Sequence, residues 1–150
     1  TSALEQFAKG LDVVTYEFEN VPVDAAMHLE KFVPVYPPPI ALEKAQDRFV
    51  EKTFFQELGI PTPKFTIDLN SSFGFPTVLK TRRMGYDGKG QFTINNYSNL
   101  LKCWNELDKT NCVIEEKINI KKEISIIGAR TIDGRIKIFP SFRGNVLALI

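Results

Sequence analysis

The residues best suited to chemistry lie in the stretch 77–91, where a strand-like segment runs into cations and a glycine-rich loop. Its apolar residues Val78 and Leu79 favour a buried strand. Three cations and three glycines follow closely: Lys80, Arg82, Arg83, Gly85, Gly88 and Gly90. Glycine lets the backbone approach a ligand, and cations beside exposed N–H groups favour a polyanion such as a polyphosphate. An ordinary hairpin turn whose charges face water is the alternative.

Two familiar phosphate-binding motifs do not fit this loop. A P-loop needs Gly-Lys-Ser/Thr at the start of a helix, but here Lys89 precedes Gly90, and residues 91–94 favour a strand. The dinucleotide-binding fingerprint has the reverse glycine spacing and also opens a helix. The sequence therefore predicts a flap between two strands that lies over phosphates.

Composition indicates a globular protein of about one domain. The chain has 150 residues, of which 43% are hydrophobic and 25% charged, with a net charge of +1. That charge argues against a nucleic-acid surface spread over the whole domain. Cys103 and Cys112, with His28 as the single histidine, make a zinc site unfavourable and fit a reduced interior. With no membrane-length apolar run and no signal-peptide pattern, we expect a cytoplasmic enzyme or binding domain.

The first forty residues predict a β-α-β unit preceded by a short helix. Helices are expected over residues 2–9 and 22–31, and strands over 11–15 and 32–36, which should pair in parallel. Ligands of open α/β sheets sit beyond the carboxyl ends of strands, where Glu17 and Glu19 lie. A solvated loop that caps the next helix is the alternative for these carboxylates. Because one such unit makes a poor sheet, we expect earlier strands of a larger protein.

The next segment predicts a connector and a long helix. Prolines 37–39 form a stiff connector and a candidate domain boundary. Residues 40–58 have apolar side chains with a 3.6-residue period, which predicts one helix that ends at Gly59. The charged residues of this helix lie mainly off its apolar face, so periodicity favours their exposure to water: Lys44, Asp47, Arg48, Glu51 and Lys52.

The remainder predicts strands around one further helix. Strands are expected over residues 64–67, 77–81, 91–94 and 112–115, with a helix over 99–108 that Ser98 caps and that buries Trp104. A long strand over 123–132 should turn at the two residues Asp133 and Gly134 and pair with residues 135–139. Residues 140–150 give no clear signal.

Several short motifs occur in one order that resembles a known enzyme family. They are residues 17–22 (Glu-Phe-Glu-Asn-Val-Pro), 46–48 with 51–52, 58–63, 78–80, 85–91 (Gly-Tyr-Asp-Gly-Lys-Gly-Gln), 115–118, and Glu123 with 129–130 and 133–134. Over roughly residues 11–140 this order is similar to the ATP-grasp ligases of purine biosynthesis, the 5-(carboxyamino)imidazole ribonucleotide synthases. Residues 17–22 and 85–91 favour this family over biotin carboxylase and formate-dependent glycinamide ribonucleotide transformylase.

The resemblance implies an α/β ATP-grasp fold. Residues 1–39 would be the end of a parallel-sheet pre-ATP-grasp domain, and residues 40–150 an incomplete ATP-grasp domain with a lid at about 64–118. The chain would be a central fragment, inactive alone, of an enzyme that is a homodimer at full length. The ligands for Mg²⁺ would lie outside it, and Val146 stands about where a histidine is expected.

The resemblance also implies a reaction and its residues. ATP would phosphorylate bicarbonate to carboxyphosphate, which carboxylates 5-aminoimidazole ribonucleotide. Arg48 and Lys80 would contact the ATP phosphates, and Glu17 would bind the ribonucleotide. Tyr86 and Lys89 would line the catalytic side, although relatives often have arginine at the latter position. The other ATP-binding residues would be the flap (Gly85, Tyr86, Asp87, Gly88, Lys89, Gly90 and Gln91), the adenine-binding edge (Glu115, Glu116, Lys117 and Ile118) and Glu123 on the ribose.

Two other function classes stay open from the sequence. One is a non-catalytic nucleotide-binding ATP-grasp module, since the residues assigned to ATP survive better than the metal site. The other is a structural remnant without a ligand, in which the flap is an ordinary hairpin. Neither nucleic acid nor a membrane is expected as a partner.

Overall fold

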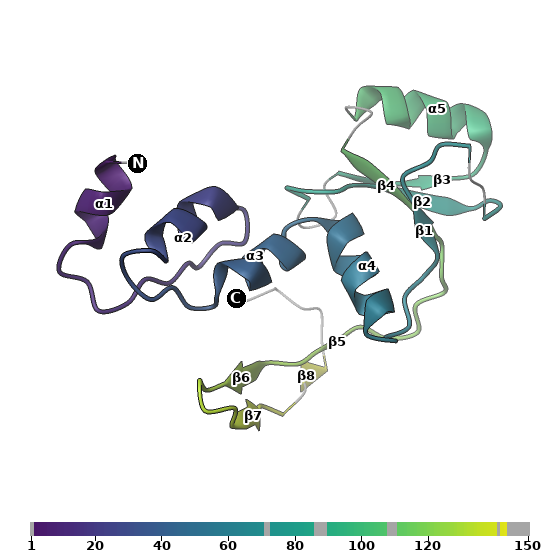
Figure 1. Cartoon of the computed structure of the whole chain (residues 1–150). Helices are drawn as coiled ribbons and strands as arrows, with labels where there is room; N and C mark the ends of the chain where they lie inside the picture. The colour runs from purple at the N-terminus through teal and green to yellow at the C-terminus, as the bar shows by residue number, and fades with distance from the viewer. Residues whose placement is uncertain (1, 71–72, 86–89, 108–110, 141, 144–150) are drawn as a thin grey trace. The chain divides into compact units, whose positions relative to one another are not determined.

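The computed structural model describes residues 2–70, 73–85, 90–107, 111–140 and 142–143. The chain divides into two units, the first ending at Lys117 and the second beginning at Ile118 (Figure 1). Within these described ranges, no helix has the length and hydropathy needed to cross a membrane. The expected domain boundary after residue 39 and the lid at 64–118 stay predictions.

The first residues fold as two helices beside a minimal parallel pairing. Helix α1 is Ser2–Ala8 and α2 is Val23–Leu29, close to the expected ranges. In place of the two expected strands there is a single parallel bridge between Val14 and Val35, as expected in direction but without regular pairing on either side. The small core beneath this bridge consists of Ala8, Leu29, Val33 and Val35.

The long helix expected over residues 40–58 is wrong: it is two helices. Helix α3 is Pro39–Ala45 and α4 is Arg48–Glu57. The break lies at Asp47, whose backbone is extended (φ −121°, ψ 114°) and whose carboxylate accepts from the N–H groups of Phe49 and Val50. An aspartate that caps a helix in this way begins a new one, although the apolar period continues across the break.

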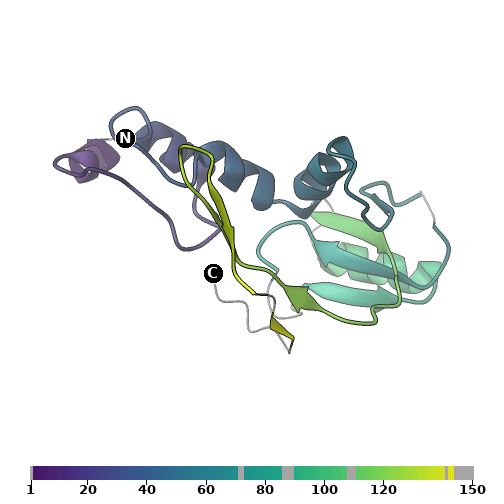
Figure 2. The same ribbon diagram turned by 90° about the horizontal axis from the view of Figure 1, so that it is seen from below.

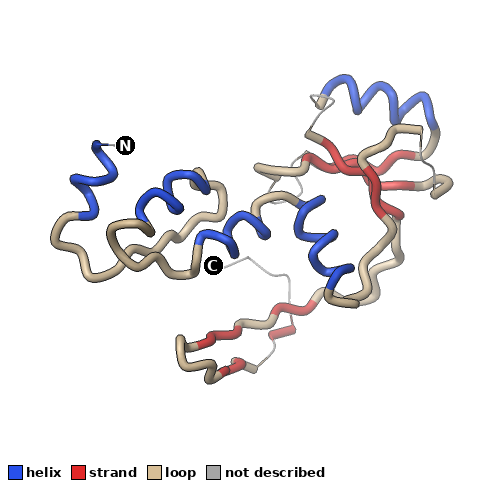
Figure 3. Tube along the Cα trace, in the orientation of Figure 1, coloured by secondary structure: helices blue, strands red, loops and turns tan. Residues whose placement is uncertain are grey.

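A four-stranded antiparallel sheet follows, whose strands are red in Figure 3. The strand order is β1-β4-β2-β3. Its strands are β1 (Phe65–Thr66), β2 (Thr77–Thr81), β3 (Gln91–Ile94) and β4 (Cys112–Glu116), as the sequence predicts to within two residues. Helix α5 is Tyr97–Glu106. Its cap is Asn96, not Ser98, because the Asn96 side chain accepts from the N–H of Asn99.

The two faces of this sheet differ in character. On one face α5 packs on an apolar core that includes Trp104, which is buried as predicted. The buried members of that core are Leu79, Ile94, Leu100, Trp104, Cys112 and Ile114. Strand alternation sends Lys80 and Glu115 to the other face, where Phe49 of α4 meets Phe65 edge to face. The charges of Lys80 and Glu115 therefore lie between the sheet and α4.

The second unit consists of short antiparallel pairs. Strand β5 (Ile124–Ser125) pairs with β8 (Phe142–Arg143), and β6 (Gly128–Arg130) pairs with β7 (Ile136–Ile138) (Figure 2). The single long strand expected over 123–132 is therefore divided. The turn is also longer than expected: Thr131 N–H donates to Arg135 O at 2.9 Å, and the loop of three residues includes Gly134 at φ +88°.

Candidate functional site

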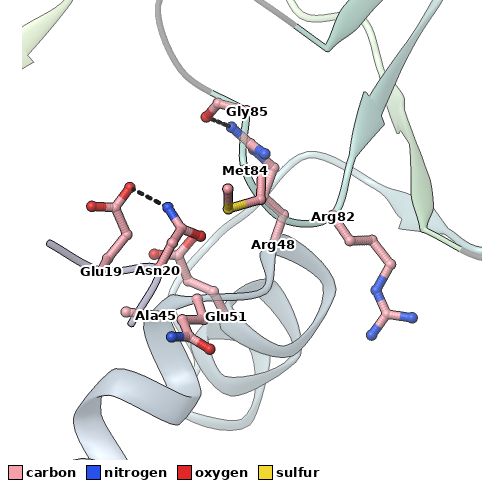
Figure 4. Close-up of a pocket in the computed structure, with 9 residues that line it drawn as sticks. Glu19, Asn20, Ala45, Arg48, Glu51, Arg82, Met84 and Gly85 are labelled. Atoms are coloured by element: carbon pink, nitrogen blue, oxygen red, sulfur yellow. Dashed lines mark hydrogen bonds between the residues drawn. The ribbon is translucent and has the colours of Figure 1, made fainter. Parts of the chain in front are cut away.

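Two of the predicted site residues, Arg48 and Gly85, line a small cavity at the start of α4. This cavity has a volume of about 130 Å³ and lies between the loop after the Val14 bridge, the α3–α4 corner and the loop after β2 (Figure 4). Its lining carries both signs of charge: Glu19, Asn20, Ala45, Gln46, Arg48, Glu51, Arg82, Met84 and Gly85. A second cavity of about 540 Å³ shares Asn20, Gln46 and Met84 with it.

Arg48 holds the first part of the glycine-rich loop. It is the first residue of α4, so the backbone fixes its direction. Its Nη1 donates to Thr81 O and its Nη2 to Gly85 O, each at 2.7 Å. These contacts use two of the five guanidinium N–H donors. The expectation from periodicity that Arg48 faces water is wrong, because the helix break turns it toward the loop.

Gly85 and Gly90 pack so closely against Arg48 and Thr81 that a side chain in either place would force these neighbours to move. A Cβ on Gly85 would lie 2.8 Å from Arg48 Nη1. Gly90 has φ +70°, and its Cβ would lie 2.6 Å from Thr81 Oγ1. The Gly90 carbonyl accepts from Thr81 N–H at 2.8 Å, which closes the base of the loop. The expected flap residues Tyr86, Asp87, Gly88 and Lys89 lie outside the described residues.

Asp47 joins the loop after β2 to the start of α4. Its residue is 4% exposed, and its carboxylate binds Arg82 at both oxygens, with Nε at 2.9 Å from Oδ1 and Nη2 at 2.7 Å from Oδ2. Burial would raise the pKa of this carboxyl, but hydrogen bonds from Arg82 and the backbone outweigh burial and leave the pKa below its ordinary value. Asp47 is thus a buried, ionised anchor, not the solvated residue that periodicity favoured.

Gln46 ties the same corner to the segment that carries the acidic residues 17 and 19. Its amide Nε2 donates to Val21 O, and its Oε1 accepts from Arg83 Nη1 at 3.2 Å. Glu19, which accepts from Asn20 Nδ2 at 3.2 Å, lies at the cavity (Figure 4). Glu17 is exposed and, among the described residues, lines neither cavity. Its assignment to the ribonucleotide stays a prediction.

Glu115 on β4 is shared by two lysines. Its Oε2 accepts from Lys80 Nζ at 2.9 Å, and Lys52 Nζ of α4 lies 3.4 Å away. The residue is 4% exposed, and within the described part of the chain its Oε1 has no hydrogen-bond partner. A buried carboxylate oxygen left without a donor suits a ligand that brings one. Two lysines against one carboxylate also leave a positive excess beside the loop.

Glu51 contributes a carboxyl that resists ionisation. It lies one turn after Asp47 on α4 and lines the smaller cavity. Burial raises its pKa, and the charges of Lys52 and Arg48 offset only part of this effect. The expectation that Glu51 and Lys52 face water is therefore wrong for both residues.

The remaining predicted site residues are not all brought together. Gln91 begins β3 opposite Lys80, and Glu116 N–H donates to Lys64 O at 2.8 Å. Lys117 is exposed at the end of the first unit, while Ile118 and Glu123 belong to the second. In the described ranges, no three His, Cys, Asp or Glu side chains form a group that could hold a metal ion.

Several residues that organise this region had no specific role from the sequence. Gln46 entered only as part of a motif, Arg82 only as one of the cations near the loop, and Asp47 and Lys52 were expected in water. The available signal was Asp47 itself, since an aspartate before a helical run is an N-cap candidate. Its pairing with Arg82, 35 residues away, needs the tertiary structure.

In a comparison with known proteins, two family models match successive parts of the chain. A model of the ATP-grasp domain matches residues 53–146, and a model of the ribonucleotide synthetase preATP-grasp domain matches residues 1–46. The chain is 42% identical over 93% of its length to a bifunctional purine synthesis protein purC/E of Dictyostelium discoideum, of which it covers 15%.

Two further relatives carry the name of one enzyme. The chain is 40% identical over 91% of its length to an N5-carboxyaminoimidazole ribonucleotide synthase of Pseudomonas aeruginosa, of which it covers 40%. It resembles the crystal structure of the N5-carboxyaminoimidazole synthetase of Staphylococcus aureus complexed with ADP, with a TM-score of 0.86 and 33% identity. That match covers 97% of this chain and 41% of the other. The chain thus spans well under half the length of these relatives.

Proposed function

The chain belongs to the ATP-grasp family, and we propose that it supplies part of the ATP site of an enzyme that carboxylates 5-aminoimidazole ribonucleotide. In the proposed reaction ATP phosphorylates bicarbonate to carboxyphosphate. The exocyclic amine of the ribonucleotide then takes the carboxyl group, and ADP and phosphate are released. The relatives named for this product at 40% identity support the assignment of the substrate.

The observation that carries the proposal is the charge arrangement at the stem of the glycine-rich loop. Lys80 and Arg48 lie where the loop leaves β2, and a side chain at Gly85 or Gly90 would press on Arg48 or Thr81. Fixed cations beside close-packed glycine backbone suit a triphosphate, whose transfer depends mainly on positioning and charge neutralisation. In this proposal Lys80 and Arg48 orient the phosphates, and the loop 85–91 shields carboxyphosphate from water.

The adenine side of the proposal rests on Glu115. Its Oε1 is buried, has no hydrogen-bond partner among the described residues, and would accept from the exocyclic amine of adenine. Residues 116–118 would offer backbone groups to the ring edge, and Glu123 would accept from the ribose. Tyr86 and Lys89 would act on the carboxyphosphate side. These roles follow from the family resemblance.

Asn20 lines both cavities, and the ribonucleotide would bind on this side of them. The larger, at about 540 Å³, has the volume of a small-molecule site. Glu17 belongs to the loop that forms this side. Mg²⁺ would accompany ATP, but the described residues offer no set of donors for it, so no step of this proposal passes through the metal. A cytoplasmic homodimer would be the working form.

Thermal unfolding in the presence of Mg-ATP tests the phosphate assignment. We expect ATP to raise the midpoint of the wild-type chain and to leave that of Lys80→Met unchanged, since binding to the folded state stabilises it. Lys102→Met is the matched control, because Lys102 is an exposed lysine of α5, the helix on the opposite face of the sheet. An equal shift in wild type and Lys80→Met would refute the assignment.

Catalysis is tested separately in the longest available form of the protein. Phosphate release from ATP that requires both bicarbonate and 5-aminoimidazole ribonucleotide would support the carboxylase. A thermal shift with ATP but no such release would favour the non-catalytic nucleotide-binding module instead.

A further inference from the structure

Glu115, Lys80 and Lys52 form a charged cluster between β2, β4 and α4. The proposed function assigns no role to Lys52. This lysine projects from α4, and its side chain is 14% exposed, against 25% for that of Lys80. Its Nζ lies 3.4 Å from Glu115 Oε2 and 6.0 Å from the centre of the Phe65 ring. Lys52 is thus a deeply placed lysine whose ammonium faces a carboxylate and an aromatic ring.

Without ATP, Lys80 is bound to Glu115 and is not free to contact a phosphate. Lys80 Nζ lies 2.9 Å from the same Glu115 oxygen, so the cation assigned to phosphate is engaged by a carboxylate. To bind phosphate, Lys80 must leave Glu115, which is buried. A buried carboxylate that loses its cation is strongly destabilised unless another cation compensates it. The ease with which Lys80 can leave therefore depends on what else neutralises Glu115.

We propose that Lys52 is a positioning residue that takes over the neutralisation of Glu115 and so releases Lys80 to the ATP phosphates. Both lysines contact the same oxygen, so Lys52 needs to move by less than an ångström to reach ordinary hydrogen-bond distance. Lys52 stays behind Glu115 and does not touch ATP. This inference rests on the proposed role of Lys80 at the phosphates.

The proposal predicts that loss of Lys52 selectively weakens ligands that carry phosphates. In Lys52→Met, Glu115 keeps Lys80 as its single cation, so ATP must pull Lys80 from an otherwise uncompensated carboxylate. We expect the Kd for Mg-ATP to rise about tenfold or more, the range of one charge-assisted hydrogen bond. Adenosine has no phosphate and leaves Lys80 in place, so its affinity, measured by competition, should change less than twofold. Lys52→Arg keeps the charge and should restore most of the ATP affinity.

A second background separates this hand-over from direct phosphate binding by Lys52. Glu115→Gln keeps an oxygen that can accept from adenine but no longer holds Lys80. In that background Lys52→Met should cost no further ATP affinity. Isothermal titration of the four proteins of this cycle with Mg-ATP measures the coupling, with Lys102→Met as the surface-lysine control.

The possible results are distinct. An equal loss of ATP and adenosine affinity in Lys52→Met would mean that Lys52 only supports the fold, which overturns the proposal. An equal loss in the wild-type and Glu115→Gln backgrounds would place Lys52 on the phosphates, which also overturns it, as would an unchanged ATP affinity in Lys52→Met. If Lys80→Met binds ATP as wild type does, the phosphate assignment itself fails, and the hand-over fails with it.

Discussion

Replacing Asp47 tests whether one carboxylate joins α4 to the loop after β2. Asp47→Ala removes the helix cap, the pair with Arg82 and a longer, exposed contact with Arg83 at 3.5 Å, and the last of these contributes little. The cap on the Phe49 and Val50 N–H groups is worth about 1 kcal/mol. The paired Arg82 loses a buried partner, which costs about 3–5 kcal/mol when the remaining charge is fully buried. The side chain of Arg82 is 22% exposed and can hydrate, so we take about 2 kcal/mol for this part.

The expected total is therefore about 3 kcal/mol, and the assay is urea and thermal unfolding. For a chain of this length it corresponds to a fall in Tm of about 6–12 °C. Asp47→Ser keeps a capping oxygen but loses the Arg82 pair, so it should cost about 1 kcal/mol less than Asp47→Ala. If Asp47→Ser is as stable as wild type, the pair with Arg82 contributes nothing and the reasoning is refuted.

The pH dependence provides a second check on Asp47. Its folded pKa is depressed, so its contribution is fully present above the unfolded carboxyl pKa of about 3.9 and is lost as pH falls through the lower folded value. The stability difference between wild type and Asp47→Ser should therefore be constant above about pH 5 and shrink below about pH 4. A difference that stays constant to pH 2 would mean that the carboxylate charge has no part in it.

Two further predictions concern the loop and the cavity. Gly90→Ala should destabilise the chain more than Gly59→Ala. Both glycines have positive φ, but only at Gly90 would a Cβ press against Thr81 Oγ1. Equal unfolding midpoints of the two variants in urea would disprove the close fit. Glu51→Gln should stabilise the protein at pH 7, because burial raises the folded pKa of Glu51 and ionisation then costs stability as pH rises through that value. Below about pH 4, where the unfolded carboxyl is also protonated, this gain should vanish; a gain independent of pH would point to another cause.

Local pattern was sufficient for most of the α/β fold. The strands at 77–81 and 91–94 have the predicted bounds, because β-prone residues are followed by glycine and turn residues at each end. The order of short motifs was sufficient for the ATP-grasp family, which the domain match over residues 53–146 confirms. Apolar periodicity over residues 40–58 was misleading, because it continues through a helix break that one capping side chain creates.

The candidate site was only partly accessible from the sequence. Residue type and spacing pointed to Lys80 and the glycines of the loop, and the family resemblance added Arg48. The roles of Asp47 and Lys52 could not be predicted from the sequence, because each depends on a partner on a distant element. The partner is Arg82 for Asp47 and Glu115 for Lys52. A charge on a helix looks solvated from periodicity until the sheet that covers it is known.

The alternating faces of β2 determine where Lys80, the cation proposed to bind phosphate, can lie. Leu79 is fully buried against α5, while its neighbour Lys80 points to the opposite face. A slip of one residue in the pairing of β2 with β4 would exchange these faces, and Lys80 would enter the apolar core. Packing of the apolar face against α5 therefore fixes the register of β2. That register in turn fixes the position of the Lys80 ammonium group on the opposite face.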